Sequence, residues 1–231
     1  MLNLPKVIGH RGACGHAPEN TLASFATAAD LGCAMVEFDV RLSADGIPIV
    51  FHDDSLERCT DGRGPVGRLP LDRLRQLDAG GGQVIPTLAE VLALCGARGL
   101  AVNIEIKPDR GAGAATAQAA LAVARQVWHG PPPLVSSFDR DALAVARDQA
   151  PDWPRSLLVN RVPAAWPDLV AHFGCVAVGA HHHALTPAVV AALRDAGLAV
   201  LAYTVNRPTR AHRLWKRGVS AVFCDVPDLL L

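Results

Sequence analysis

Residues 34–40 read AMVEFDV, an apolar run of strand length that carries two carboxylates, Glu37 and Asp39, toward its end. Other short apolar runs lead to His10 and to Glu105 in the same way. In a (β/α)8 barrel the catalytic groups lie at the C-terminal ends of the strands. This pattern therefore predicts a barrel whose polar side chains gather at one end.

Apolar runs alternate along the chain with helical patterns, which is typical of βα units around a parallel sheet. We expect barrel strands near residues 6–10, 34–40, 100–106, 133–137, 156–159, 175–179, 198–204 and 220–224. We expect helices near residues 20–32, 87–98, 114–128, 140–149, 165–173, 187–196 and 207–217, with Thr87 and Thr186 as N-caps. The predicted fold class is an α/β (β/α)8 TIM barrel.

Residues 47–52 form a further apolar run that breaks this alternation. Only residues 43–46, Ser-Ala-Asp-Gly, separate it from the second strand, whereas a parallel crossover needs about a dozen residues. We therefore predict an extra β-hairpin arm with an Asp-Gly turn. Because the chain folds back at this turn, we expect His52 to lie level with Glu37 and Asp39. Residues 53–86 are predicted to form a long loop or cap within one domain spanning 1–231.

The composition restricts the partners and the compartment. The chain has 231 residues and a formal net charge of +0, with 22 basic and 22 acidic residues. This balance argues against nucleic acid or an anionic membrane bound through bulk charge. The six cysteines form no C-x-x-C pair, which favours reduced thiols. No signal peptide or apolar run of about 18 residues is apparent, so we expect a cytoplasmic protein without stable membrane anchoring.

Three carboxylates point to a metal site. Glu37 and Asp39 are two residues apart on a strand, so both point to one face, which in a barrel is the interior. Glu105 adds a third carboxylate on the next barrel strand. Buried carboxylates are costly unless they meet a cation, and a carboxylate set suits Mg²⁺ or Ca²⁺. The alternative is that Arg11 and Lys107 neutralise them by ion pairing.

Two histidines are candidates for general acid and base. His10 and His52 have an ordinary pKa of about 6.5, which suits both roles near neutrality. Arg11 beside His10 favours His10 as the base, because a neighbouring cation disfavours its protonated form. The sequence does not otherwise assign the two roles. Lys107 alternates with Glu105 and would stand one layer above it, where a phosphate would lie.

Two further signals are weaker. Residues 181–183 are three consecutive histidines, and alternation along a strand would bring only His181 and His183 to the barrel mouth. His181 is thus a candidate substrate contact, the alternative being an ordinary strand-end residue. Residues 62–67 match G-x-G-x-x-G, but they lie in an irregular loop and open no helix, which argues against a dinucleotide site.

These residues, in this order, resemble the glycerophosphodiester phosphodiesterase family, in particular its short cytoplasmic bacterial form. The matching motifs are His10-Arg11-Gly12, Pro18-Glu19-Asn20-Thr21, Glu37-Phe38-Asp39-Val40, Asp45-Gly46, His52-Asp53, Asp78-Ala79-Gly80, Ile85-Pro86-Thr87-Leu88, Asn103-Ile104-Glu105-Ile106-Lys107, Ser136-Ser137-Phe138, Tyr203-Thr204-Val205-Asn206, Gly218-Val219 and Cys224-Asp225. Together they cover nearly the whole chain.

The resemblance implies a (β/α)8 barrel, a divalent cation, and hydrolysis of glycerophosphodiesters to glycerol 3-phosphate and an alcohol. By this resemblance the metal ligands are Glu37, Asp39 and Glu105, the acid and base are His10 and His52, and the phosphate contacts are Arg11 and Lys107. Glu19, His181 and Tyr203 are further candidate substrate contacts. Glu19 is expected to orient the site. The chain departs from the family in the short segment 81–84, which implies a small cap, and in Cys224, where the family has threonine.

Two other functions stay open at this point. One is a phospholipase D-like lyase or a phosphodiesterase acting on intact phospholipids or lysophospholipids, which would need an apolar rim or a basic membrane patch. The other is a non-catalytic barrel that binds phosphoesters. Glycerol 3-phosphate release from glycerophosphocholine, with and without chelator, separates them. The sequence leaves open the head group, the metal, a cyclic intermediate against direct water attack, and whether the chain is a monomer or a homodimer.

Overall fold

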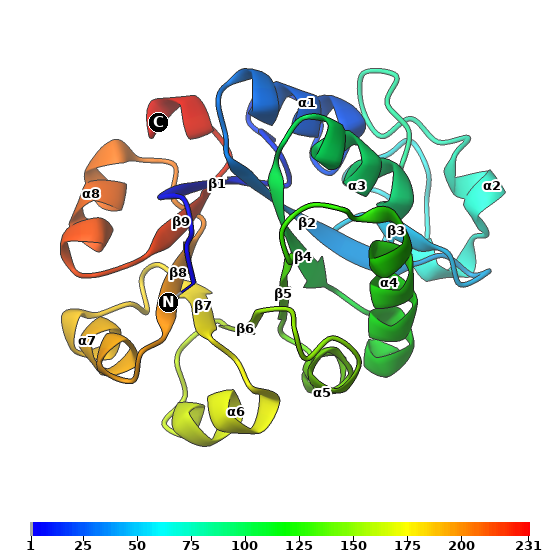
Figure 1. Cartoon of the computed structure of the whole chain (residues 1–231). Coiled ribbons are helices and arrows are strands. Elements are labelled where there is room, and N and C mark those ends of the chain that lie inside the picture. Colours follow the sequence, from blue (N-terminus) through cyan, green and yellow to red (C-terminus); the bar gives the residue numbers. More distant parts are fainter. Residues whose placement is uncertain (1) are drawn as a thin grey trace.

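Eight parallel strands form a closed barrel in the computed structural model, which describes residues 2–231 (Figure 1). The ring runs β1-β9-β8-β7-β6-β5-β4-β2, and pairing of β1 with β2 closes it. The strands are β1 (Val7–His10), β2 (Met35–Leu42), β4 (Ala101–Ile106), β5 (Leu134–Ser137), β6 (Arg155–Val159), β7 (Ala177–His181), β8 (Ala199–Tyr203) and β9 (Ala221–Cys224). The predicted (β/α)8 TIM barrel is confirmed.

Helices surround the barrel on its outside (Figure 1). They are α1 (Leu22–Asp30), α3 (Leu88–Ala97), α4 (Gly113–Val127), α5 (Arg140–Gln149), α6 (Trp166–Phe173), α7 (Pro187–Asp195) and α8 (Pro208–Lys216), and a short 3-10 helix (Pro227–Leu229) follows β9. Thr87 and Thr186 cap α3 and α7 as predicted, and Thr87 forms a full capping box with Glu90. Within residues 2–231, no helix combines the length and apolar character needed to cross a bilayer.

The additional strand β3 (Pro48–Val50) lies outside the ring and pairs antiparallel with β2. Gly46 has φ +78°, a left-handed conformation that glycine adopts without strain, and its N–H donates to the Ser43 carbonyl to close the turn. The predicted hairpin arm is thus confirmed. A four-residue link leaves the chain no alternative to folding back on β2.

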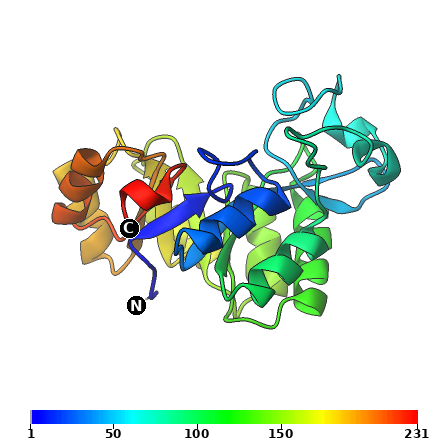
Figure 2. The same ribbon diagram turned by 90° about the horizontal axis from the view of Figure 1, so that it is seen from above.

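Residues 51–86 form a lobe beside this arm (Figure 2). The lobe contains a 3-10 turn (Val66–Arg68) and the one-turn helix α2 (Leu71–Leu74), where the sequence indicated a short helix near 71–77. It packs around a small apolar core of its own, made by Ile49, Phe51, Leu56, Val66, Leu74, Ala79 and Ile85. This core lets an otherwise irregular segment hold fixed positions beside the barrel mouth.

The barrel interior is apolar toward one end and charged at the other. Ile8, Met35, Leu201 and Phe223 belong to one buried cluster. Side chains two residues further along a strand point to the same side. His10 and Glu37 therefore continue these interior columns toward the C-terminal ends of the strands. The two-residue period of the strands thus places the polar side chains directly above the apolar cluster of the barrel interior.

Candidate active site

A cavity of about 250 Å³ opens at the C-terminal ends of the barrel strands. Eight of the ten residues predicted for the site line it: His10, Arg11, Glu37, Asp39, His52, Glu105, Lys107 and Tyr203. Glu19 lies behind Arg11, and His181 lines a different cavity. Residues far apart in the sequence therefore meet as strand-end placement predicts.

The three carboxylates form one group, in which Glu37 and Asp39 are buried and Glu105 is partly exposed. Strand register pairs Asp39 with Glu105, and Glu37 with His10. One oxygen from each of Glu37, Asp39 and Glu105 lies within 4.8 Å of the others. The Arg11 Nε and Lys107 Nζ atoms lie 3.5 and 3.8 Å from the nearest Asp39 oxygens, so both contacts with Asp39 are long. Ion pairing with these two cations thus accounts for only part of the cluster.

Glu37 carries the observation that favours a cation. Its Oε2 accepts the Arg11 backbone N–H at 3.0 Å, but its buried Oε1 has no hydrogen-bond partner within residues 2–231. A buried oxygen left without a donor is costly. Hard divalent cations take several carboxylate oxygens as ligands. The donor set formed by Glu37, Asp39 and Glu105 therefore fits such an ion.

Electrostatics in this cluster follow from burial and mutual repulsion. Burial, reinforced by the charges of Asp39 and Glu105, raises the pKa of Glu37 well above its ordinary value. Burial and the Asp39 charge also raise the pKa of Glu105 to about 7. Burial opposes ionisation of Asp39, but Arg11 and other positive neighbours keep its pKa below the ordinary value. The neighbours thus favour the charged form of Asp39, whereas the charged forms of Glu37 and Glu105 gain most from an added counter-charge.

A second group, His10, Cys14 and Asp225, also lies within ligand distance. Burial and the neighbouring Asp225 carboxylate raise the pKa of the Cys14 thiol, which disfavours the thiolate that metals bind. The thiol instead donates a hydrogen bond to Asp225 at 3.1 Å. This group is therefore better suited to holding His10 than to holding a metal.

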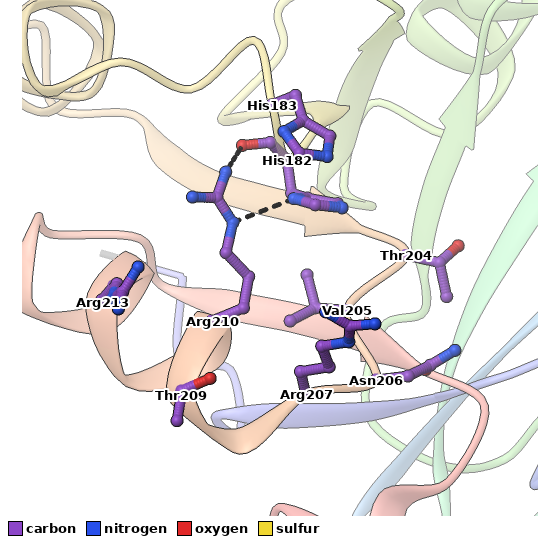
Figure 3. Close-up of a pocket in the computed structure, with 9 residues that line it drawn as sticks. All are labelled: His182, His183, Thr204, Val205, Asn206, Arg207, Thr209, Arg210 and Arg213. Atoms are coloured by element: carbon purple, nitrogen blue, oxygen red, sulfur yellow. Dashed lines mark hydrogen bonds between the residues drawn. The ribbon is translucent and has the colours of Figure 1, made fainter.

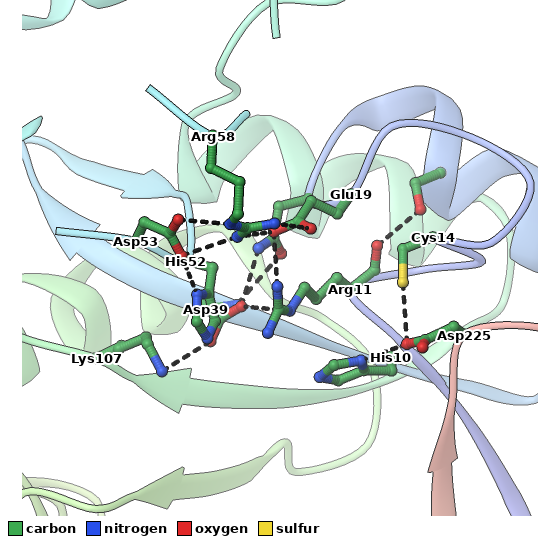
Figure 4. Close-up of polar contacts among 12 residues, drawn as sticks. His10, Arg11, Cys14, Glu19, Asp39, His52, Asp53, Arg58, Lys107 and Asp225 are labelled. Atoms are coloured by element: carbon green, nitrogen blue, oxygen red, sulfur yellow. Dashed lines mark hydrogen bonds and ion pairs between the residues drawn. The ribbon is translucent and has the colours of Figure 1, made fainter. Parts of the chain in front are cut away.

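Each candidate histidine is fixed by a carboxylate at Nδ1 (Figure 4). Nδ1 of His10 lies 2.6 Å from Asp225, and Nδ1 of His52 lies 2.5 Å from Asp53. Nε2 of each ring remains for the reaction, and Nε2 of His10 is 4.0 Å from Glu37. A carboxylate at one ring nitrogen fixes the tautomer and the orientation of the other.

Positively charged side chains lie near His52 as well as beside His10. The pKa of His52 is lowered first by burial and also by Arg11 and Lys107, against the opposing effect of Asp39. A neighbouring cation therefore does not distinguish His10 from His52 as the base. The assignment of acid and base stays a prediction.

Sequence reasoning assigned no role to Asp225, Asp53 or Arg58. Asp225 directly follows β9, so the strand-end criterion could have identified it. Arg58 lies in the irregular lobe and gave no signal. Its guanidinium binds both oxygens of Glu19 at 2.7 and 2.8 Å and both oxygens of Asp53 at 2.6 and 2.8 Å. Arg58 thereby connects the lobe to both sides of the site.

The expectation that alternation separates the three consecutive histidines is wrong. Strand β7 ends at His181, and His182 and His183 lie in the following turn, where the two-residue period no longer applies. The His181 ring stacks on those of His182 and His183, which are tilted relative to each other, and the centroids lie between 4.1 and 5.3 Å apart. His181 contacts the Tyr203 ring at a centroid distance of 6.0 Å but does not line the central cavity.

A (β/α)8 barrel with acids, histidines and cations around one strand-end cavity is the arrangement expected of a barrel hydrolase acting on phosphate esters. Comparison with known proteins identifies a family within this class of hydrolases. The model of the glycerophosphoryl diester phosphodiesterase family matches residues 10–229. The chain belongs to this family, and it is a phosphodiester hydrolase.

Individual relatives agree over nearly the full length. A phosphodiesterase from Oleispira antarctica, solved with the product sn-glycerol-3-phosphate, is 40% identical, with a TM-score of 0.96 over 98% of this chain and 95% of that one. A glycerophosphodiester phosphodiesterase from Caldanaerobacter subterraneus is 30% identical over 97% of this chain and 96% of its own. Another from Bacillus subtilis is 31% identical over 96% and 84%.

The pairing of Glu19 with Arg58 and Arg11 makes stability depend on pH. Burial opposes ionisation of Glu19, but these arginines lower its pKa to about 2, against an ordinary 4.5. A lowered pKa contributes stability above pH 4.5 that is lost as pH falls toward 2. We expect Glu19→Gln to reduce the free energy of unfolding by about 2–3 kcal/mol at pH 7.

Denaturant unfolding at several pH values measures this difference. The Glu19→Gln deficit should shrink between pH 4.5 and 2.5, because the unfolded state takes up a proton on Glu19 in this range while the folded state, with a pKa of about 2, resists it. Asp54→Asn, at an exposed position of the same lobe, is the control. A deficit that stays constant across this range would show that the charge of Glu19 is not what stabilises the site.

Proposed function

We propose that this chain is a metal-dependent glycerophosphodiesterase that releases glycerol 3-phosphate and an alcohol, with two histidines as acid and base. The observation that carries the proposal is the meeting, in one cavity, of three closely spaced carboxylates with two carboxylate-held histidines. Sn-glycerol-3-phosphate bound to the Oleispira antarctica relative supports this choice of product.

Glu37, Asp39 and Glu105 would hold the divalent cation, with Mg²⁺ or Ca²⁺ favoured by their all-oxygen donor set. Such an ion supplies charge stabilisation for the phosphoryl oxygens and lowers the pKa of a bound hydroxyl. Asn20 donates to Asp39 at 2.9 Å and so fixes one of the ligand oxygens. The unpartnered Oε1 of Glu37 supports a metal at this position.

Arg11 and Lys107 contribute the fixed positive charge for the phosphate. Lys107 Nζ lies 3.4 Å from Glu105 and 3.8 Å from Asp39, at the cavity wall. Arg11 is anchored by Glu19 at 2.7 Å, which leaves it oriented before substrate arrives. Preorganised cations stabilise the developing charge of the transition state without reorganisation.

His10 and His52 would move the protons. One takes the proton of the attacking hydroxyl, and the other gives a proton to the departing alcohol oxygen. The hydroxyl belongs either to the substrate's own glycerol, giving a cyclic phosphate that water then opens, or to water directly. Asp225 and Asp53 keep both rings in one orientation through this exchange.

The cavity rim favours a water-soluble substrate over an intact lipid. Among the exposed large apolar side chains of residues 2–231, only Phe138 lines the catalytic cavity. Its ring packs against Tyr203 with a centroid distance of 5.9 Å, and Lys107 lies over its face. A lipid-directed lyase would need a wider apolar rim. The six free cysteines support a cytoplasmic location.

The metal assignment predicts the behaviour of Glu105→Gln. Loss of one anionic ligand should weaken divalent-ion binding at least tenfold and reduce glycerol 3-phosphate release from glycerophosphocholine below 1% of wild type, on the order expected for a lost metal ligand. Calorimetry with Mg²⁺ and Ca²⁺ and a coupled assay with and without chelator measure both effects. Asp72→Asn, at an exposed position of helix α2, is the matched control. Unchanged ion affinity in Glu105→Gln would refute the assignment.

The activities of the two histidine variants should depend differently on the leaving group of the substrate. A good leaving group such as nitrophenol departs with little need of a proton. We therefore expect one of His10→Ala and His52→Ala to retain activity on an aryl phosphodiester while losing about 10²–10⁴-fold on glycerophosphocholine. The other variant, lacking the base, should be impaired on both substrates. Lys107→Ala should lower both activities alike. Equal fractional losses for both histidine variants would remove the distinct roles.

A further inference from the structure

A second cavity, of about 570 Å³, lies at the same end of the barrel (Figure 3). It is formed by the turn after β7, the segment after β8 and the start of α8. Thr204 lines both this cavity and the catalytic one, so the two adjoin along the segment that follows Tyr203. The proposed mechanism uses none of the charged groups in this second cavity.

The charged lining of this cavity is entirely basic. Arg207, Arg210 and Arg213 line it together with His182 and His183, and no carboxylate does. The arginine–carboxylate ion pairs found within residues 2–231 engage other arginines. Because the whole chain has a net charge of +0, this is a local concentration of positive charge.

One of these arginines is fixed in place. Nε of Arg210 donates to Nδ1 of His182 at 3.0 Å, and Nη2 donates to the His182 backbone carbonyl (Figure 3). These bonds tie α8 to the turn after β7 and hold the guanidinium at the cavity wall. A guanidinium positioned in advance loses little further freedom when it binds an oxyanion.

The basic side chains around this cavity disfavour one another's protonated forms. The pKa of Arg210 is lowered first by burial and then by the charges of Arg217 and Arg213. Burial, followed by His183 and Arg210, lowers the pKa of His182 to about 4. A bound anion would relieve this repulsion, since each cation would then meet an opposite charge.

The backbone at this place adds to the positive potential. Helix α8 begins after Arg207 with no side-chain cap and with Pro208 in its first turn. Free N–H groups at a helix start favour negative charge. In (β/α)8 barrels, the loops after the seventh and eighth strands frequently form a phosphate site. Here the seventh and eighth strands of the ring counted along the chain are β8 and β9, and the segment after β8 carries Arg207.

We propose that this cavity is a second oxyanion site, which binds a phosphate group other than the one being hydrolysed. Guanidinium groups match phosphate oxygens in pairs, which favours phosphate over smaller anions. The phosphate is either a second phosphate on the alcohol part of the substrate or free inorganic phosphate. The substrate-borne case rests on the proposed function, whereas binding of free phosphate does not.

Binding is tested without any catalytic readout. Inorganic phosphate is titrated into the full chain in the absence of divalent ions, and the ring signals of His182 and His183 are followed by NMR. We expect saturable shifts of both rings in wild type. Arg207→Gln and Arg213→Gln should each weaken the apparent affinity about tenfold, the loss expected for one charge-assisted contact. Arg194→Gln, exposed on α7, should bind within twofold of wild type.

Kinetics then identify the source of the phosphate. Glycerophosphoglycerol is compared with the same diester phosphorylated on its second glycerol. If the substrate carries the phosphate, Arg213→Gln raises KM about tenfold for the phosphorylated diester alone, with kcat unchanged. If free phosphate is the ligand, both KM values in Arg213→Gln stay as in wild type while its affinity for phosphate is weakened. Absence of saturable shifts at His182 and His183, or equal affinities in all three arginine variants, overturns the proposal.

Discussion

The repulsion among three closely spaced carboxylates is the constraint on which the active end of the barrel depends. Strand register brings Glu37, Asp39 and Glu105 together, and the first two are buried while Glu105 is partly exposed. Arg11 and Lys107 offset only part of this charge, since they lie 3.5 and 3.8 Å from Asp39 and Lys107 lies 3.4 Å from Glu105. The residual charge is what makes the cluster a cation site, because a divalent ion satisfies ligand oxygens that hydrogen bonds leave free.

Around this cluster, the two histidines and Arg11 are each held by a carboxylate. Asp225 holds His10 and Asp53 holds His52, while Glu19 holds Arg11. Arg58 joins two of these partners and connects them to the lobe formed by residues 51–86. The lobe's own apolar core fixes Arg58 indirectly. Folding of an irregular segment is thereby coupled to the geometry of the catalytic groups.

The barrel and the centre of the site follow from local rules. The two-residue strand period predicts the interior direction of Glu37 and Asp39, and the short link at 43–46 predicts the return that delivers His52. Arg58 could not be predicted, because an irregular lobe has no period to orient it. The arrangement of residues 181–183 escaped prediction because β7 ends at His181, so that alternation does not extend to His182 and His183. The basic cavity also escaped, since it joins segments that only tertiary packing brings together.

Anomalous diffraction from crystals soaked in Mn²⁺ tests the central claim most directly. Mn²⁺ takes the same oxygen ligands as Mg²⁺ and can be located without reference to activity. The account predicts one strong peak bounded by Glu37, Asp39 and Glu105. A peak instead among His10, Cys14 and Asp225, or no peak between the three carboxylates at saturating Mn²⁺, would contradict it.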